Sequence, residues 1–127
     1  MRVQITGDRN WTDRSVIEKA LRVVMTETGQ TPVVVHGAAR GADSLSGEVA
    51  EELGCTVEVY PADWLKYGKA AGPIRNKQML DTGPDVVLAF HDDLENSKGT
   101  RHCVTEAEKR GLEVRKYTTE SFSDEAL

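Results

Sequence analysis

Three short apolar runs in this chain are each followed closely by a loop that carries glycine. The runs are residues 3–5, 33–35 and 86–90, and the glycine-bearing loops are residues 6–11, 36–43 and 97–100. Runs of this length, rich in β-branched residues, are typical of strands buried in a parallel sheet. Because parallel strands end at one edge, we expect the loops to meet there, beside the free N–H groups of helix N-termini. The first hypothesis is therefore a phosphate-sized anion site at this edge.

Helical patterns separate the predicted strands along the whole chain. We expect strands at 1–6, 31–36, 56–60, 85–90 and 113–117, with helices at about 12–27, 42–53, 73–81 and 99–110. Strict alternation predicts an α/β fold, Rossmann-like, with a parallel sheet and helices on both faces. In the strand order 3-2-1-4-5, the switch point lies between the first and fourth strands. Two of the three glycine-bearing loops follow those strands, where ligands bind in such sheets.

Length and composition are those of one ordinary globular domain. The chain has 127 residues, of which 39% are hydrophobic and 29% charged. No stretch approaches the ~20 apolar residues that span a bilayer. The first residues show no signal-peptide pattern, so we expect a cytoplasmic protein without a membrane partner. We assign residues 1–117 to the domain, and residues 118–127 to a polar, acidic tail that is mobile or loosely docked.

Charge and cysteine content disfavour several classes of function. The formal net charge is −5, and no segment carries a run of Lys or Arg, which argues against nucleic acid as a partner. Cys55 and Cys103 lack metal-ligand spacing, and we interpret each as a small buried residue. We therefore expect no metal and no bound cofactor. A homo-oligomer is left open.

The first loop contributes Gly7, Asp8, Arg9 and Trp11 as candidate ligand contacts. Gly7 lets the backbone approach a ligand closely, and Arg9 offers a bidentate fork for phosphate. Trp11 has two interpretations of equal weight: it stacks on a ring of the ligand, or it anchors the first helix to the sheet.

The second loop contributes His36, Gly37, Gly41 and Asp43. The two glycines bracket a tight turn, and Asp43 lies in the first turn of the following helix. Asp43 either complements the helix dipole or binds a ribose hydroxyl. His36 is either a structural histidine or a ligand contact. The segment is neither a P-loop nor the dinucleotide fingerprint.

The third and fourth candidate groups lie at predicted helix starts. Arg75 and Asn76 fall in a first turn, where a cation has no reason from the helix dipole to lie and a bound anion would supply one. The segment before them, 60–72, is too long for a simple connector. Lys98, Gly99 and Thr100 form either a phosphate cradle or an ordinary N-cap.

Taken together, the motifs at 6–11, 36–43, 60–64, 72–76 and 99–103 resemble the YspA-like branch of the SLOG superfamily, over residues 2–117. The resemblance implies a Rossmann-like fold that binds nucleotides or nucleotide-derived ligands. The family usually carries Ser where this chain has Asp8. Since an acid repels phosphate, the first loop would then contact a sugar or a base.

The better-studied relatives implied by this resemblance are the Lonely Guy phosphoribohydrolases. Their Arg-Lys-x-x-Met motif is similar to residues 75–79, and their Gly-Gly-x-Gly-Thr-x-x-Glu motif is similar to the segment that ends at 103. The catalytic Glu of those enzymes falls on Cys103, and a thiol cannot replace a carboxylate at an oxocarbenium-like centre.

The leading interpretation is therefore a module that binds a nucleoside phosphate or an ADP-ribose-like molecule as a sensor or sequestering protein. The alternative is an N-glycosidase that uses another group, with Asp8, Asp43, Glu106 and Arg75 as candidates. A DNA-processing function is a third interpretation, which the acidic balance and the small size disfavour.

Overall fold

Five parallel strands form one sheet in the order β3-β2-β1-β4-β5. The strands are β1 (Arg2–Gly7), β2 (Val33–His36), β3 (Thr56–Val59), β4 (Val86–Phe90) and β5 (Glu113–Tyr117). The computed structural model describes residues 1–123. The fold class and the strand order predicted from the sequence are confirmed. Because β1 and β4 are neighbours in the sheet, the switch point lies between them, as expected.

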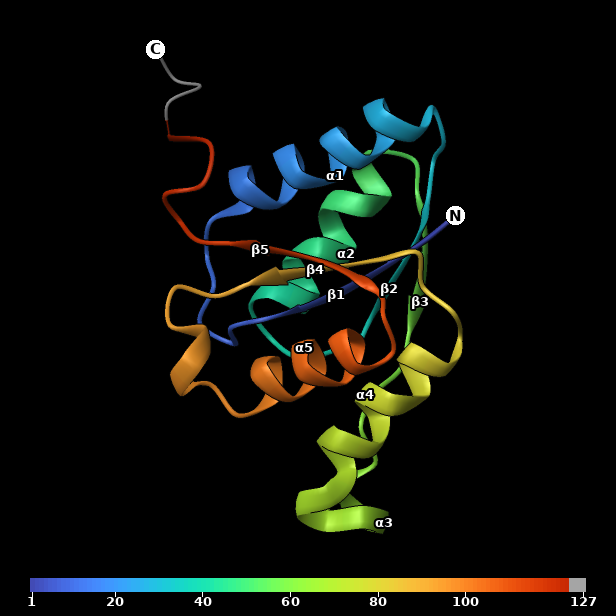
Figure 1. Ribbon diagram of the computed structural model, residues 1–127, viewed down its shortest axis with the longest axis vertical. Coiled ribbons are helices and arrows are strands. Elements are labelled where there is room, and N and C mark those ends of the chain that lie inside the picture. The colour runs from blue at the N-terminus through green and yellow to red at the C-terminus, as the bar shows by residue number, and fades with distance from the viewer. Residues whose placement is uncertain (124–127) are drawn as a thin grey trace.

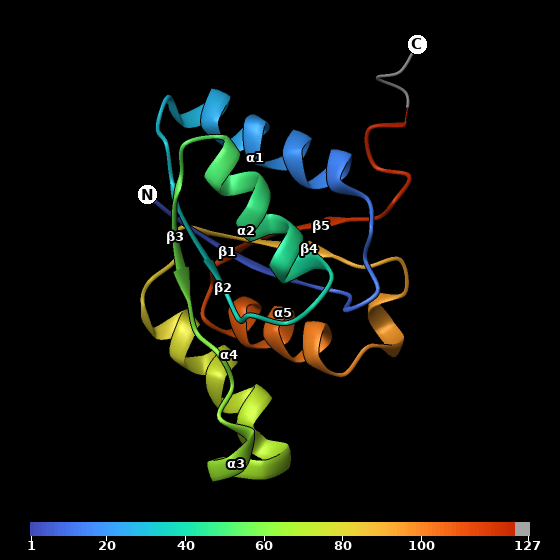
Figure 2. The same cartoon turned by 180° about the vertical axis from the view of Figure 1, so that it is seen from behind.

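Helices cover both faces of the sheet (Figures 1 and 2). Helices α1 (Arg14–Thr28) and α2 (Ala42–Glu52) lie on one face, and α4 (Ala71–Asp81) and α5 (Gly99–Lys109) lie on the other. The larger apolar core lies under α1 and α2, where Ile5 and Leu88 of the sheet pack with Ile17 and Leu21. A smaller cluster on the other face contains Leu80, Val87 and Ala107.

Helix α1 begins two residues later than the sequence pattern predicted. Asp13 is the N-cap, and its carboxylate accepts hydrogen bonds from the N–H groups of Ser15 and Val16. The other end was predicted closely: Gly29 caps the helix in the left-handed conformation, with φ of 65°.

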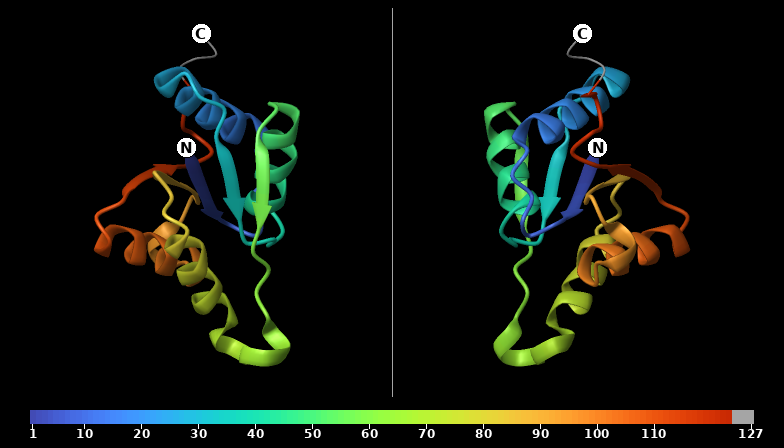
Figure 3. Two further views of the ribbon diagram at one scale, coloured as in Figure 1. Left: turned by 90° about the vertical axis from the view of Figure 1, so that its right-hand side faces the viewer. Right: turned by 90° about the vertical axis from the view of Figure 1, so that its left-hand side faces the viewer.

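A helical arm replaces the irregular connector expected before α4. It consists of α3 (Trp64–Tyr67) and the 3₁₀ turn η1 (Gly68–Ala70), and the Asp63 side chain caps it by accepting from the N–H of Lys66 at 3.1 Å. Helix α4 therefore starts at Ala71, and Pro73 lies third in its first turn, where a missing N–H costs nothing. Figure 3 shows this arm beyond the ends of the strand arrows, at the carboxyl edge of the sheet.

The segment after β5 turns back onto the sheet end. The Phe122 ring stacks on Tyr117 with centroids 5.7 Å apart, and the Thr119 N–H donates to Asp92 at 2.7 Å. The first part of the predicted tail is thus docked, and residues 124–127 lie outside the described residues. The domain boundary at Tyr117 stays a prediction. Among residues 1–123, no helix combines the length and apolar character that crossing a membrane requires.

Candidate functional site

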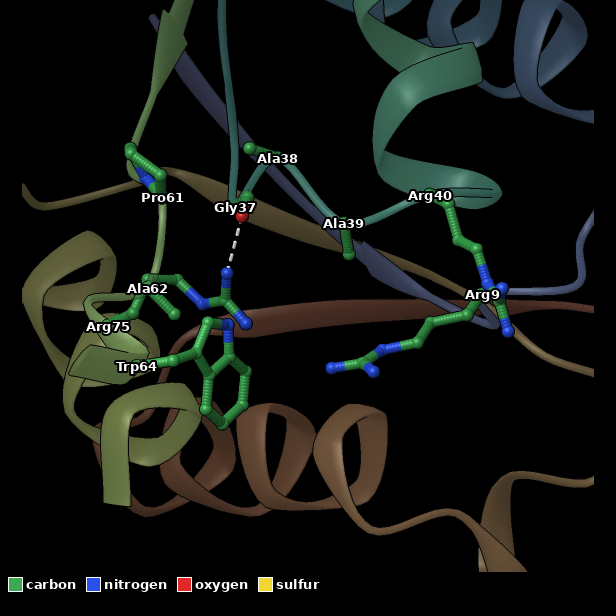
Figure 4. Close-up of a pocket in the computed structure, with 9 residues that line it drawn as sticks. All are labelled: Arg9, Gly37, Ala38, Ala39, Arg40, Pro61, Ala62, Trp64 and Arg75. Atoms are coloured by element: carbon green, nitrogen blue, oxygen red, sulfur yellow. Dashed lines mark hydrogen bonds between the residues drawn. The ribbon is translucent and has the colours of Figure 1, made fainter. Parts of the chain in front are cut away.

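A groove of about 720 Å³ lies at the carboxyl edge of the sheet, between the loop after β1, the loop after β2 and the N-termini of α4 and α5. The structure brings many of the candidate residues together along its walls: Gly7, Asp8, Arg9, Asp43, Arg75, Asn76, Lys98, Gly99 and Thr100. A second cavity of about 460 Å³, which we call the arginine pocket, shares walls with the groove (Figure 4). The shared residues are Arg9, Ala39, Arg40, Trp64 and Arg75.

The loops after β1 and β2 are held in direct contact. The carbonyl oxygen of Asp8 accepts a hydrogen bond from the N–H of Ala42 at 3.0 Å. Gly41 has φ of 74°, and a Cβ there would lie 2.4 Å from the carbonyl oxygens of Asp8 and Arg9. Only glycine fits this conformation at this distance. Gly41 therefore joins the two loops, and it does not line either cavity.

Three arginines line both cavities without forming an ion pair with a carboxylate. Elsewhere in residues 1–123, five arginines each form an ion pair with an acidic side chain: Arg2, Arg14, Arg22, Arg110 and Arg115. Arg101 instead donates to the backbone carbonyl oxygen of Glu95 at 3.0 Å. Within the same residues, no ion pair joins Arg9, Arg40 or Arg75 to a carboxylate. The three come from the β1 loop, the β2 loop and α4, respectively. An acidic chain thus concentrates unpaired positive charge at one place.

Arg75 is the most deeply held of the three. Its Nη1 donates a hydrogen bond to the carbonyl oxygen of Gly37, and its Nε donates to the side chain of Asn76 at 3.0 Å. Asn76 in turn donates to the carbonyl oxygen of Gly99 at 3.4 Å. Burial lowers the pKa of Arg75, and the charge of Asp43 opposes that effect. This chain of contacts fixes the β2 loop, α4 and the start of α5 relative to one another.

Asp43 lies beneath the β2 loop and organises it. One carboxylate oxygen accepts hydrogen bonds from the N–H of Gly37 at 3.1 Å and of Ala39 at 3.2 Å. Burial raises the pKa of Asp43 to about 6, although these amides and Arg75 favour the charged form. Asp43 is also one of the residues that line the groove. A contact with a ribose hydroxyl stays a prediction.

The N-terminus of α5 is open toward the groove. Lys98 is the N-cap residue and makes no side-chain capping bond, so the alternative that Thr100 is an ordinary N-cap is wrong. The N–H of Arg101 is bound by the Ser97 hydroxyl at 3.1 Å. The N–H groups of Gly99 and Thr100 lie in the first turn, which has no intrahelical acceptors. Together with Lys98 they offer donors to an anion.

Trp11 and His36 are buried, and neither lines the groove or the arginine pocket. Trp11 is 4% exposed, packs on Phe90 and donates from its indole nitrogen to the carbonyl oxygen of Asp13 at 2.8 Å. It therefore anchors the start of α1, and stacking on a ligand does not fit its position. His36 is buried, and its Nδ1 accepts from the N–H of Ala38 at 3.0 Å. Burial lowers the pKa of His36, with Arg75 adding to the effect, which favours the neutral ring.

Glu106 and Cys103 also lie outside the groove. The Glu106 carboxylate is 3.9 Å from His102 and 3.8 Å from Lys109, and it lines neither cavity. The Cys103 side chain is fully buried beneath the groove, where its sulfur accepts from the Gln4 side chain at 3.3 Å. Burial raises the pKa of Cys103 to about 11, so the thiol is protonated at neutral pH.

The structure adds Arg40, Trp64, Lys69 and His91 to the candidate set. His91 approaches Asp8, with its Nε2 4.0 Å from the carboxylate, and its Nδ1 accepts from the N–H of Asp93 at 2.9 Å. Arg40 and Trp64 lie in the motifs at 36–43 and 60–64, but no sequence pattern predicted that these two side chains line a cavity. Within residues 1–123, no group of three or more His, Cys, Asp or Glu side chains is arranged to hold a metal ion.

Comparisons with known proteins agree with this architecture. The chain is 45% identical over 118 residues to the Gene 61 protein of Mycobacterium phage D29, which covers 89% of this chain and 93% of that protein. The X-ray structure of DNA processing protein A (DprA) from Streptococcus pneumoniae superposes with a TM-score of 0.72 over 91% of this chain. That likeness has 18% sequence identity and spans 49% of the DprA chain, so it shows the fold alone.

The first half of the chain matches the model of a known protein family. The family model for the YspA, cpYpsA-related SLOG family matches residues 1–67, which include the loops after β1 and β2 and the Tyr60–Trp64 segment. On this match, this chain belongs to the YspA, cpYpsA-related SLOG family.

Proposed function

We propose that this protein binds a nucleotide or a nucleotide-derived ligand through its phosphate, at the groove on the carboxyl edge of the sheet. The observation that carries the proposal is that Arg9, Arg40 and Arg75 line the same two cavities and form no ion pair with a carboxylate among the described residues. Guanidinium groups are planar, permanently charged and matched to phosphate oxygens. The family and the fold are consistent with a nucleotide-related function.

The polarity of the groove suggests an orientation for the ligand. The arginines lie at the side shared with the arginine pocket, and the open start of α5 supplies further donors. Asp8 also lines the groove, and its carboxylate would repel a phosphate placed against it. Phosphate therefore belongs with the arginines or at α5, and a sugar hydroxyl belongs with Asp8. The groove volume of about 720 Å³ is within the range of small-molecule sites.

Binding without turnover is the preferred form of this function. By the motif resemblance, Cys103 stands where the Lonely Guy enzymes carry their catalytic Glu, and its side chain is buried. Asp43 is engaged by two backbone N–H groups. A sensor or a sequestering protein needs only the loops and the charges described here.

One observation supports a hydrolase as the second candidate. Asp8 is a carboxylate in the groove, and its pairing with His91 at 4.0 Å could hold an attacking water. In an N-glycosidase, the bond between the anomeric carbon and the base would break as this water adds to that carbon. Asp8 would take one proton from the water, and that proton would then pass to the departing base. Release of free base is the observation that separates the two candidates.

Calorimetric titration with AMP and ADP tests the proposal. Arg40→Ala should weaken binding by roughly 1.5–3 kcal/mol, the scale of hydrogen bonds to charged groups. Arg22→Ala is the matched control, because Arg22 is an exposed arginine on α1 whose partner is Glu18. Equal losses of affinity in the two variants, or none in Arg40→Ala, would contradict a phosphate site at the arginines.

A further inference from the structure

Trp64 is an exposed aromatic ring inside a ligand-sized cavity. It lines both the groove and the arginine pocket, and 50% of its surface is accessible. The ring comes from α3, in the arm that stands beyond the sheet edge. On its inner side the ring approaches Gly72, where a Cβ would lie 3.4 Å from Cη2. The fold therefore presents this ring to the cavity and does not cover it.

The surroundings of Trp64 are cationic. The Cζ atom of Arg9 lies 6.0 Å from the centroid of the Trp64 ring, and Figure 4 shows the Arg9 side chain extending across the cavity toward it. Arg75 lies on the same side of the pocket as Trp64 in this view. A simple anion would use the guanidinium groups and leave the indole in water. A flat ring that carries a phosphate uses both.

We propose that the heterocyclic base of the ligand stacks on the ring of Trp64 in the arginine pocket. The phosphate of the same ligand then binds Arg9, Arg40 and Arg75. This inference rests on the proposed function, because it assigns the base of the same phosphate-bearing ligand. Stacking on an aromatic side chain accepts any base, since every base has a π face. The site would thus distinguish nucleotides from phosphosugars.

The two tryptophans of the chain make a direct test available. Trp11 is 4% exposed, so quenching of fluorescence by the neutral quencher acrylamide reports on Trp64. The assignment is checked in Trp64→Phe, which should lose the quenchable emission. The probes are AMP, GMP, CMP and UMP, with ribose 5-phosphate as the phosphate without a base.

The proposal predicts that the nucleotides protect Trp64 from acrylamide and that ribose 5-phosphate does not. Trp64→Leu should weaken AMP binding about tenfold and leave ribose 5-phosphate binding unchanged, because stacking alone is removed. Trp64→Phe should retain most of the AMP affinity, since it keeps an aromatic face. Because Trp64 is exposed, both variants should melt close to the wild-type protein.

The outcomes separate this inference from the function on which it rests. If ribose 5-phosphate and AMP bind equally, and Trp64→Leu affects neither, the phosphate site stands and the stacking platform is wrong. If none of these probes binds, the proposed function fails and the inference fails with it. If Trp64 is already protected in the ligand-free protein, in a manner that depends on protein concentration, the ring is an interface between copies and the inference is overturned.

Discussion

Arg75 lies directly across the backbone of Gly37. Its Nη1 donates to the Gly37 carbonyl oxygen, and a Cβ at position 37 would lie 2.3 Å from the same nitrogen and 2.6 Å from Cζ. Only a residue without a side chain allows a guanidinium to rest on the loop in this way. Gly37 thus determines where the positive charge of Arg75 is placed.

Gly37→Ala should therefore act on ligand affinity through Arg75. The new methyl group displaces the guanidinium, and we expect a loss of about 1–2 kcal/mol in AMP binding, approaching the roughly 1.5–3 kcal/mol expected for Arg75→Ala. A double-mutant cycle measured by calorimetry checks the cause. In the Arg75→Ala background, Gly37→Ala should have little further effect. Fully additive losses would show that Gly37 acts independently of Arg75.

Asp43 should make stability depend on pH in a defined direction. Burial raises its pKa from 3.8 to about 6 in the folded protein, so the folded state holds the proton more tightly than the unfolded chain. The contribution of Asp43 to the unfolding free energy is thus greatest below pH 4 and is lost as the pH rises to about 6. Relative to Asp43→Asn, the wild-type protein should lose at most about 3 kcal/mol between pH 4 and pH 7.

Urea unfolding of both proteins across this pH range measures the difference, because all groups common to the two cancel. The prediction is contradicted if the wild-type protein instead gains stability relative to Asp43→Asn as the pH rises. That result would show that Arg75, Arg9 and the loop amides stabilise the carboxylate more than burial penalises it.

The fold was predictable because its signals are local. The β-branched runs and the helical patterns lie within short windows, and their alternation restricts the topology to very few arrangements. The exact start of α1 was misplaced by two residues, because it depends on the hydrogen bonds that the Asp13 side chain makes to Ser15 and Val16. The helical arm at Trp64–Ala70 was missed because four-residue helices show no clear apolar period.

The candidate site was predictable only as a set of loops. Net charge argued against nucleic acid as a partner, whereas the arginines of the groove come from three distant segments and meet only in the folded chain. The same limit applies to the tryptophans. Trp11 follows a glycine loop and packs in the core, and Trp64 follows a proline and faces the cavity. The exposure of each ring depends on its contacts with residues that are distant in the sequence, such as Phe90 for Trp11.

Position 103 should not accept a catalytic carboxylate. Because the Cys103 side chain is fully buried, Cys103→Glu places an ionisable group beneath the groove, and we expect a loss of several kcal/mol in the unfolding free energy. The loss should be greater at pH 8 than at pH 5, since burial favours the protonated acid. Cys103→Ser is the milder control. A stable Cys103→Glu protein that releases free base from AMP would contradict this placement.

Asp8 decides between binding and hydrolysis. If the protein only binds, the wild-type protein releases no base from any nucleoside monophosphate during long incubation, as followed by chromatography. Asp8→Asn should then change nucleotide binding by no more than roughly 0.5 kcal/mol, because the amide keeps an acceptor for the sugar hydroxyl and the repulsion it removes, between two screened charges ~7 Å apart, is small. Glu18→Gln, on the outer surface of α1, is the control. Base release that is abolished by Asp8→Asn would instead establish the hydrolase.

The central claim is that phosphate is recognised at the convergence of three arginines. The most direct test of this claim measures how much an added nucleotide raises the unfolding free energy of the protein. The same measurement is made with the matching nucleoside, for each of the four common bases. At ~100 times the dissociation constant, a bound nucleotide should add about 2.7 kcal/mol, while the nucleoside adds far less. The nucleotide shift should fall sharply in the Arg9→Ala/Arg40→Ala double variant and persist in Arg22→Ala. Equal shifts for nucleoside and nucleotide, or nucleotide shifts that persist in the double variant, would contradict the account.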